Sequence, residues 1–190
     1  MMINDKQELP DNQQTAQQEE PIDEEGIFVQ YAGLVLIHPF VSRLFDKLEL
    51  VKERKFENRY TQQKALYLLH YLATGLVTAE EFELAVAKLL CNWPMDLPVE
   101  KNIELTMAET AEADNMLEAA IGQWAVLKTT SVAALREGFL QRNGKLSDRK
   151  GKLHLQVETT FLDVLLDQLP WNLGMIKLPW MKTMLWVEWR

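Results

Sequence analysis

The side chains best suited to acid–base chemistry in this sequence are two carboxylates and one imidazole near its C-terminal end. Asp163 and Asp167 are four residues apart, so on a helix they would share a face, as a pair of catalytic carboxylates could. His154 precedes them in a segment of alternating polarity. Paired acids at this spacing are common on solvated helix faces, and catalysis needs a pocket that shifts their pKa values. An enzyme or small-ligand domain built from these three residues is therefore the less favoured hypothesis.

No other set of residues indicates a catalytic, cofactor or metal site. The sequence has no glycine-rich phosphate loop, no GxSxG elbow, no HExxH pair and no cluster of Cys or His. The single cysteine, Cys91, excludes an internal disulfide, and its place at the end of an apolar helical pattern favours an inert, half-buried thiol. His38 lacks a second ligand at metal spacing, and His70 is a single histidine in an apolar-rich element, so structural roles are favoured for both. We predict that the protein has no catalytic residue, cofactor or metal and is not an enzyme.

Aromatic residues near the C-terminal end are the feature that most needs an explanation. A tryptophan side chain buries about 150–250 Å², so a segment rich in tryptophan must fold onto a core or dock on another protein. Most of these indoles are expected to be core, and partner binding is the alternative. Arg136 and Arg142 flank Phe139 on a capped helix, and an arginine there could anchor a carboxylate or a loop carbonyl, which is a structural role. The partner-binding candidates are Trp171, Trp180, Trp186, Trp189 and Arg136.

Charge is unevenly distributed along the chain. Residues 1–26 hold eight acids and one lysine, about seven of the eight net negative charges, so the remainder is nearly neutral. This acidic, glutamine-rich stretch buries too little to offset the entropy of ordering, which predicts a disordered leader at 1–26 and one globular domain at 27–190. Neither part forms a basic patch, which argues against nucleic acid as a partner. No apolar run reaches the roughly 18 residues of a membrane span, so membrane insertion is not expected.

The predicted fold is α+β and mostly α, with about five or six helices. Apolar spacing over 31–50 predicts helices, the second opened by Pro39, and a helix over 61–74 should stop at Gly75. A capping box at Thr78 should open a helix that buries Phe82, and another at Thr106 should open a long one. A short helix should follow Thr130 or Ser131.

A small antiparallel hairpin or sheet is predicted near the C-terminus. Alternation at 145–146 and 152–157, with a polar turn at 148–151, is typical of a hairpin. Residues 161–170 are a short helix or connector. Two further short strands are expected around 176–178 and 186–189, and Pro179 should limit the first of them to a sheet edge.

Six blocks, in the same order, resemble the tape measure protein family of contractile injection systems, the phage-tail-like particles that some bacteria assemble and fire. Together they cover roughly residues 31–189. The blocks are YAGLVLIHPF (31–40), LLHYLATG (68–75), KLLCNWPMDLP (88–98), LKTTSVAALREGFLQRNGKL (127–146), FLDVLLDQLPW (161–171) and IKLPWMKTMLWVEW (176–189).

The resemblance implies an assembly protein that fixes tube length and engages tail tube, baseplate or tip proteins, without catalytic residues. It implies a cytoplasmic protein during assembly that then resides within the particle. A ruler needs contour length, and the 26-residue leader would span only roughly 40 Å as a helix. The folded part is therefore better described as an anchor, either the end of a longer ruler or a short homologue. An assembly scaffold or chaperone absent from the mature particle is the alternative.

Overall fold

The computed structural model describes residue 22 and residues 24–189, so most of the predicted disordered leader (1–26) lies outside the described residues. The described part is mostly helical with a five-stranded and a two-stranded sheet, which confirms the predicted α+β class. The α-helices are α1 (His38–Lys47), α2 (Arg59–Thr74), α3 (Ala85–Leu90), α4 (Met107–Gln123) and α5 (Val132–Leu135). The 3-10 segments are η1 (Ala32–Ile37), η2 (Glu81–Leu84), η3 (Ala125–Leu127) and η5 (Phe161–Gln168), and η4 (Arg136–Leu140) is a π-helical turn.

Local capping signals place the helix ends close to where the sequence predicts them. Pro39 lies in the first turn of α1, where its missing N–H costs nothing. Gly75 ends α2 in the left-handed conformation at φ 76°. Thr106 forms a capping box with Glu109 at the start of α4, and the Ser131 hydroxyl accepts from the Ala134 N–H to open α5. None of the described helices is both long and apolar enough to cross a membrane.

The prediction for the helix after Thr78 is wrong in two respects. Its capping box is formed by Glu80 and Glu83, so the first turn begins two residues later than expected. That turn, η2, is a 3-10 segment, and its tighter winding changes which residues face inward. Leu84 is buried, whereas Phe82 points outward with 65% of its surface exposed.

The larger sheet has the strand order β1-β4-β5-β7-β6. Its central hairpin of β4 (Gly144–Arg149) and β5 (Lys152–Val157) is antiparallel, as predicted. The sheet is nevertheless mixed, because β7 (Leu185–Glu188) runs parallel to β5. β1 (Ile27–Val29) and β6 (Met175–Ile176) form the two edges, and the edge position of β6 agrees with the prediction from Pro179. A separate hairpin joins β2 (Val51–Lys52) to β3 (Lys55–Phe56).

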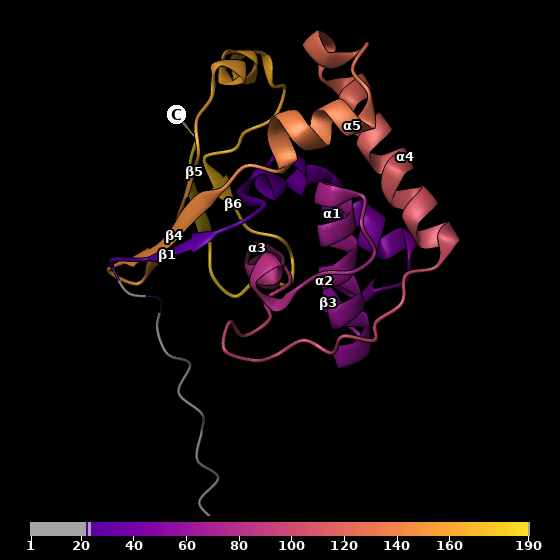
Figure 1. The fold of residues 1–190 in the computed structure, drawn as a ribbon. Coiled ribbons are helices and arrows are strands. Elements are labelled where there is room, and N and C mark those ends of the chain that lie inside the picture. Colours follow the sequence, from indigo (N-terminus) through magenta and orange to yellow (C-terminus); the bar gives the residue numbers. More distant parts are fainter. Residues whose placement is uncertain (1–21, 23, 190) are drawn as a thin grey trace, which may run out of the picture.

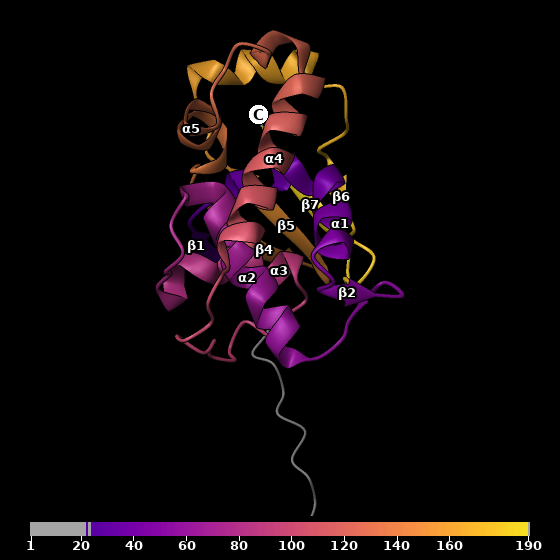
Figure 2. The same cartoon turned by 90° about the vertical axis from the view of Figure 1, so that its right-hand side faces the viewer.

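In Figure 1 the helices gather on one face of the larger sheet and no described helix covers its other face, and Figure 2, viewed from the helix side, shows the sheet behind them. Leu146 of β4 and Leu155 of β5 point into the core below the helices, and both are fully buried. One continuous cluster of buried apolar side chains runs from Val29 to Trp189. Chain segments approach closely where η1 meets η4: a Cβ on Gly33 would lie 1.8 Å from the Phe139 carbonyl oxygen, so only glycine fits there.

Candidate functional site

Trp180 is a core residue that ties the C-terminal segment to the end of α3. Its indole N–H donates to the Leu90 carbonyl oxygen at 2.8 Å, and its ring stacks on Phe45 at 5.3 Å between centroids. The ring of Phe56 in β3 lies 5.2 Å from the Trp180 ring between centroids. Only 9% of the Trp180 surface is exposed. The prediction that the tryptophans are mostly core therefore describes this residue correctly.

Trp171 links the connector after η5 to the first helices. Its indole N–H donates to the Leu36 carbonyl oxygen at 2.8 Å, 135 positions earlier in the chain. The ring is half-buried and meets Phe40 edge-on, with centroids 5.1 Å apart, and it lies 6.5 Å from the ring of Trp124. The segment after η5 is thus held at both Trp171 and Trp180 by indole hydrogen bonds to backbone carbonyls.

Trp186 lies within β7 and Trp189 directly follows this strand, and the two differ in exposure. Trp189 is buried, and its indole N–H meets no hydrogen-bond partner in the part of the chain that the structure describes. Trp186 of β7 is half-buried on the uncovered face of the sheet, where it stacks on His154 at 6.2 Å between ring centroids. Partner binding by the four tryptophans stays a prediction, and Trp186 offers the larger accessible surface of this pair.

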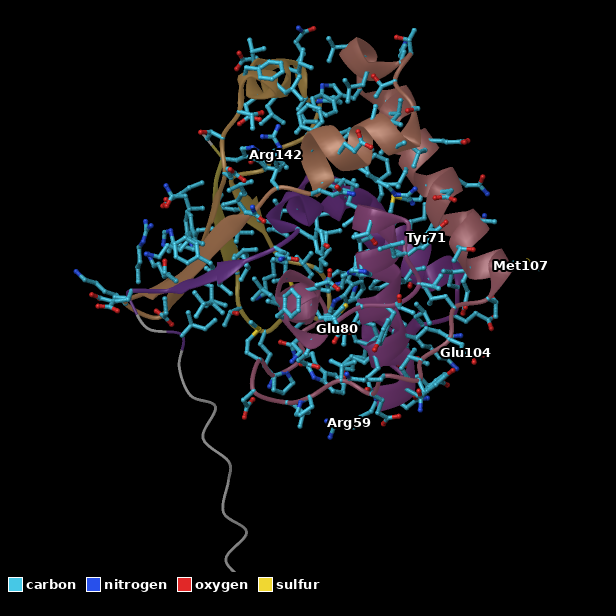
Figure 3. The ribbon with its side chains drawn as sticks, viewed as in Figure 1. Arg59, Tyr71, Glu80, Glu104, Met107 and Arg142 are labelled. Carbon is cyan, nitrogen blue, oxygen red and sulfur yellow. The ribbon has the colours of Figure 1, made fainter. Side chains whose placement is uncertain are left out.

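Arg136, the fifth partner-binding candidate, joins three elements at the start of η4. Its Nη2 donates to the Asp114 carboxylate of α4 at 2.7 Å and its Nε donates to the Leu72 carbonyl oxygen of α2 at 3.1 Å. The guanidinium also lies 5.1 Å from the ring centroid of Tyr71, which projects from α2 (Figure 3). Burial and a hydrogen bond to Asp114 raise the pKa of Tyr71. These contacts agree with the structural interpretation of Arg136, because a cation satisfies the last carbonyls of α2.

A buried ion pair joins η4 and η5. Arg142 donates from Nη2 to the Asp163 carboxylate at 3.3 Å and from Nε to the Gly138 carbonyl oxygen at 2.8 Å, with side-chain exposures of 6% and 8% for the two charged groups. Asp163 also accepts from the Thr160 N–H at the start of η5. Figure 3 shows Arg142 between these elements. The sequence indicated that Arg142 could anchor a carboxylate or a carbonyl, but it did not identify Asp163 as the partner, because 21 positions separate the two residues and no local motif links them.

The hypothesis of an acid–base site at Asp163, Asp167 and His154 receives no support from the geometry. η5 is a 3-10 segment with about three residues per turn, so residues four apart do not share a face. Asp163 is accordingly buried and paired with Arg142, whereas Asp167 is exposed. His154 lies on β5 and contacts the Glu188 carboxylate at 3.1 Å. No group of three His, Cys, Asp or Glu side chains within residues 22 and 24–189 is placed to hold a metal ion.

The remaining histidines and the cysteine have structural surroundings. Nδ1 of His38 lies 3.0 Å from the Val35 carbonyl oxygen at the start of α1. His70 is buried edge-on against Tyr31, and neither ring nitrogen has a partner at full hydrogen-bond geometry among the described residues. Cys91 is fully buried rather than half-buried, and burial raises the pKa of its thiol well above its usual range, as an inert thiol requires.

One family model matches the chain: contractile injection system tape measure protein, over residues 2–189. The match spans every described element, from β1 to β7. No curated protein and no solved structure matches the chain.

Proposed function

The chain belongs to the contractile injection system tape measure protein family, and we propose that it acts there by holding other proteins of the particle together during assembly. The observation that carries this proposal is a family match that extends over nearly the whole chain. In this proposal the protein engages tail tube, baseplate or tip proteins in the cytoplasm, contributes to setting tube length, and stays in the finished particle.

The described fold supports an anchoring role for this part of the chain. Its longest helix, α4, has 17 residues and therefore spans about 25 Å at a rise of 1.5 Å per residue. The C-terminal segment is fixed to the helices by the indole hydrogen bonds of Trp171 and Trp180. A body of packed helices and strands presents fixed surfaces to neighbouring proteins, whereas measuring the length of a tube requires an extended segment.

Particle assembly in cells tests the proposal directly. Deletion of the gene should abolish particles or produce tubes of irregular length in electron micrographs, and the wild-type gene supplied in trans should restore them. Normal particles of uniform tube length in the deletion strain would contradict the proposal.

Single substitutions separate a contact role from a folding role. Trp186→Ala should impair assembly while the purified protein loses much less stability than Trp180→Ala does, because Trp186 is half-buried on the sheet face that the helices leave uncovered. Trp180→Ala should impair assembly only through lost stability, because Trp180 is core. Mass spectrometry of purified particles distinguishes the proposal from an assembly scaffold: a scaffold is absent from them, and the proposed component is present.

A further inference from the structure

Strand register defines the composition of the uncovered sheet face. Residues directly opposite each other in neighbouring strands project to the same side of a sheet. The pairs Phe28–Lys145, Lys145–Gln156 and Gln156–Glu188 therefore form one row across four strands. The next row contains Ser147, His154, Trp186 and Met175, and the third contains Arg149 and Lys152. We call these ten residues the outer sheet face.

Two lysine ammonium groups lie beside aromatic rings on the outer sheet face. Phe28, on the edge strand β1, is 87% exposed, and the Lys145 ammonium lies 5.7 Å from its ring centroid. The Lys152 ammonium lies 5.5 Å from the ring centroid of Trp186. Phe28 keeps most of its surface exposed and can contact an apolar group of a ligand, and the ammonium groups keep N–H donors for carboxylates.

The two lysines are not neutralised by the fold. Lys145 and Lys152 form no ion pair with any residue that the structure describes. The nearby Glu188 carboxylate is engaged by Arg149 at 2.6 Å and by His154 at 3.1 Å. The chain outside residues 1–26 is nearly neutral as a whole, whereas this face carries two unpaired positive charges. An acidic ligand complements such a face.

We propose that the outer sheet face binds an acidic, extended segment of another protein of the particle. In the bound state, carboxylates of the segment meet Lys145 and Lys152, and an apolar side chain covers Phe28. A hollow of about 390 Å³ beside Phe28, lined also by Gly144, Lys145 and Gln156, gives that side chain a place. β1 forms the edge of the sheet, so an extended segment can lie alongside it.

Two other occupants fit the face less well. A second copy in a two-fold interface would bring two copies of the same patch together, and this patch carries more basic than acidic side chains. Nucleic acid would bring its phosphates close to the carboxylates of Glu188 and Glu158, which lie on or beside the same face. A protein segment can place its carboxylates selectively over the lysines.

Photo-cross-linking in assembled particles tests this inference, which rests on the proposed function. Phe28 is replaced by p-benzoylphenylalanine, particles are irradiated and purified, and joined peptides are sequenced by mass spectrometry. Phe82 is the matched control, since it is an exposed phenylalanine on η2 and not on the sheet. The probe at Phe28 should join an acidic segment of another particle protein, and the probe at Phe82 should not join that segment.

Charge reversal at the two lysines gives a quantitative test, measured as cross-link yield. Lys145→Glu combined with Lys152→Glu should lower the yield of this cross-link about tenfold, because two surface ion pairs become repulsive contacts. Lys52→Glu combined with Lys55→Glu makes the same charge change on the β2–β3 hairpin and should leave the yield unchanged. Circular dichroism of the purified variants should show the wild-type fold, since Lys52, Lys55 and Lys152 are exposed and Lys145 is only half-buried.

Joining of the Phe28 probe to residues 1–21 of its own chain, to a second copy or to nucleic acid overturns the inference. An unchanged yield after charge reversal at Lys145 and Lys152 overturns it as well. Particles that contain the protein but give no cross-link at Phe28 refute the inference and leave the proposed function standing. Particles that assemble normally and contain none of the protein refute both.

Discussion

The indole N–H of Trp180 donates a hydrogen bond to the carbonyl oxygen of Leu90 at 2.8 Å, although 90 positions separate the two residues. Leu90 is the last residue of α3, and the last four carbonyls of a helix have no partner within it. The C-terminal segment therefore supplies a donor that α3 lacks and covers Phe45 with the same side chain. The C-terminal segment is therefore part of the packing around α3 and Phe45.

Replacing Trp180 should strongly destabilise the fold. Trp180→Ala removes a buried ring and leaves a cavity, so the free energy of unfolding should fall by about 3–5 kcal/mol. Trp180→Phe keeps an aromatic ring and loses the donor to Leu90, so it should cost about 1–3 kcal/mol. Urea unfolding followed by circular dichroism measures both values.

Trp186→Ala is the control for these variants. Trp186 is half-buried and its ring lies on the outer sheet face, so its removal should cost less than about 1.5 kcal/mol. Equal losses of stability at Trp180 and Trp186 would contradict the assignment of Trp180 to the core.

The buried pair of Arg142 and Asp163 should show strong coupling. Arg142→Met leaves the Asp163 carboxylate buried without its counter-ion, so stability should fall by about 3–5 kcal/mol. Adding Asp163→Leu to Arg142→Met should restore part of that loss, because both charges are then absent. A double-mutant cycle in urea measures the coupling free energy.

The exposed pair of Arg149 and Glu188 is the matched control for this cycle. These side chains are 47% and 40% exposed, so water screens their interaction and its coupling should stay below about 1 kcal/mol. Additive effects of Arg142→Met and Asp163→Leu, with no coupling between them, would rule out the role assigned to the buried pair.

His70 should make the fold sensitive to mild acid. Burial lowers the pKa of His70, an effect that the charge of Glu83 and a backbone contact with Thr78 oppose. The unfolded chain, with a histidine pKa near 6.5, then binds more protons than the folded chain. The neutral imidazole of His70 therefore contributes its full stabilisation above pH 6.5. This contribution is lost as pH falls from 6.5 toward the lowered pKa of His70 in the folded state.

Unfolding free energies measured between pH 7 and pH 5 should fall with pH in the wild type and less steeply in His70→Leu. His38, whose pKa burial also lowers, should account for part of the remaining slope, and His38→Leu combined with His70→Leu should flatten it further. Hydrogen bonds from Arg149 hold the pKa of Glu188 below its usual 4.5. The contribution of Glu188 to stability is therefore lost only at a pH below that of the histidine titration. An identical slope in the wild type and both variants would exclude the histidines as its source.

Local sequence signals determine the features that could be predicted. Ser131, Thr106 and Gly75 cap helices through contacts with residues within four positions, and the β4–β5 hairpin closes over a short turn. The parallel pairing of β5 with β7 depends on a crossover of 27 residues between Val157 and Leu185, and no local pattern encodes it. The exposure of Phe82 depends on the 3-10 winding of η2, which helical periodicity does not reveal.

The sequence indicates residue types for the candidate site but not their arrangement, and partner binding by them stays a prediction. The abundance of tryptophan near the C-terminal end correctly indicated a segment that packs onto the core at Trp180. Which indole keeps an accessible face follows from strand alternation, since Trp186 of β7 projects to the side opposite Val187. Phe28 was not singled out, because its exposure arises from β1 forming a sheet edge through pairing with a strand over 100 residues later.

Arg136→Lys separates the two roles open to Arg136. The guanidinium donates to Asp114, Leu72 and Tyr71 at once, and a lysine ammonium lacks the planar fork needed to reach all three. Stability should therefore fall by about 1–3 kcal/mol, as measured by urea unfolding, because backbone carbonyls at the end of α2 lose a donor. The control is Gln141→Ala, which removes another side-chain donor to α2, at the Ala73 carbonyl oxygen. If Arg136 acts only through the fold, particle yield should follow stability, and Arg136→Lys should give the same yield as Gln141→Ala. A loss of assembly in Arg136→Lys well beyond that of Gln141→Ala at equal stability would instead assign Arg136 a direct contact with a partner.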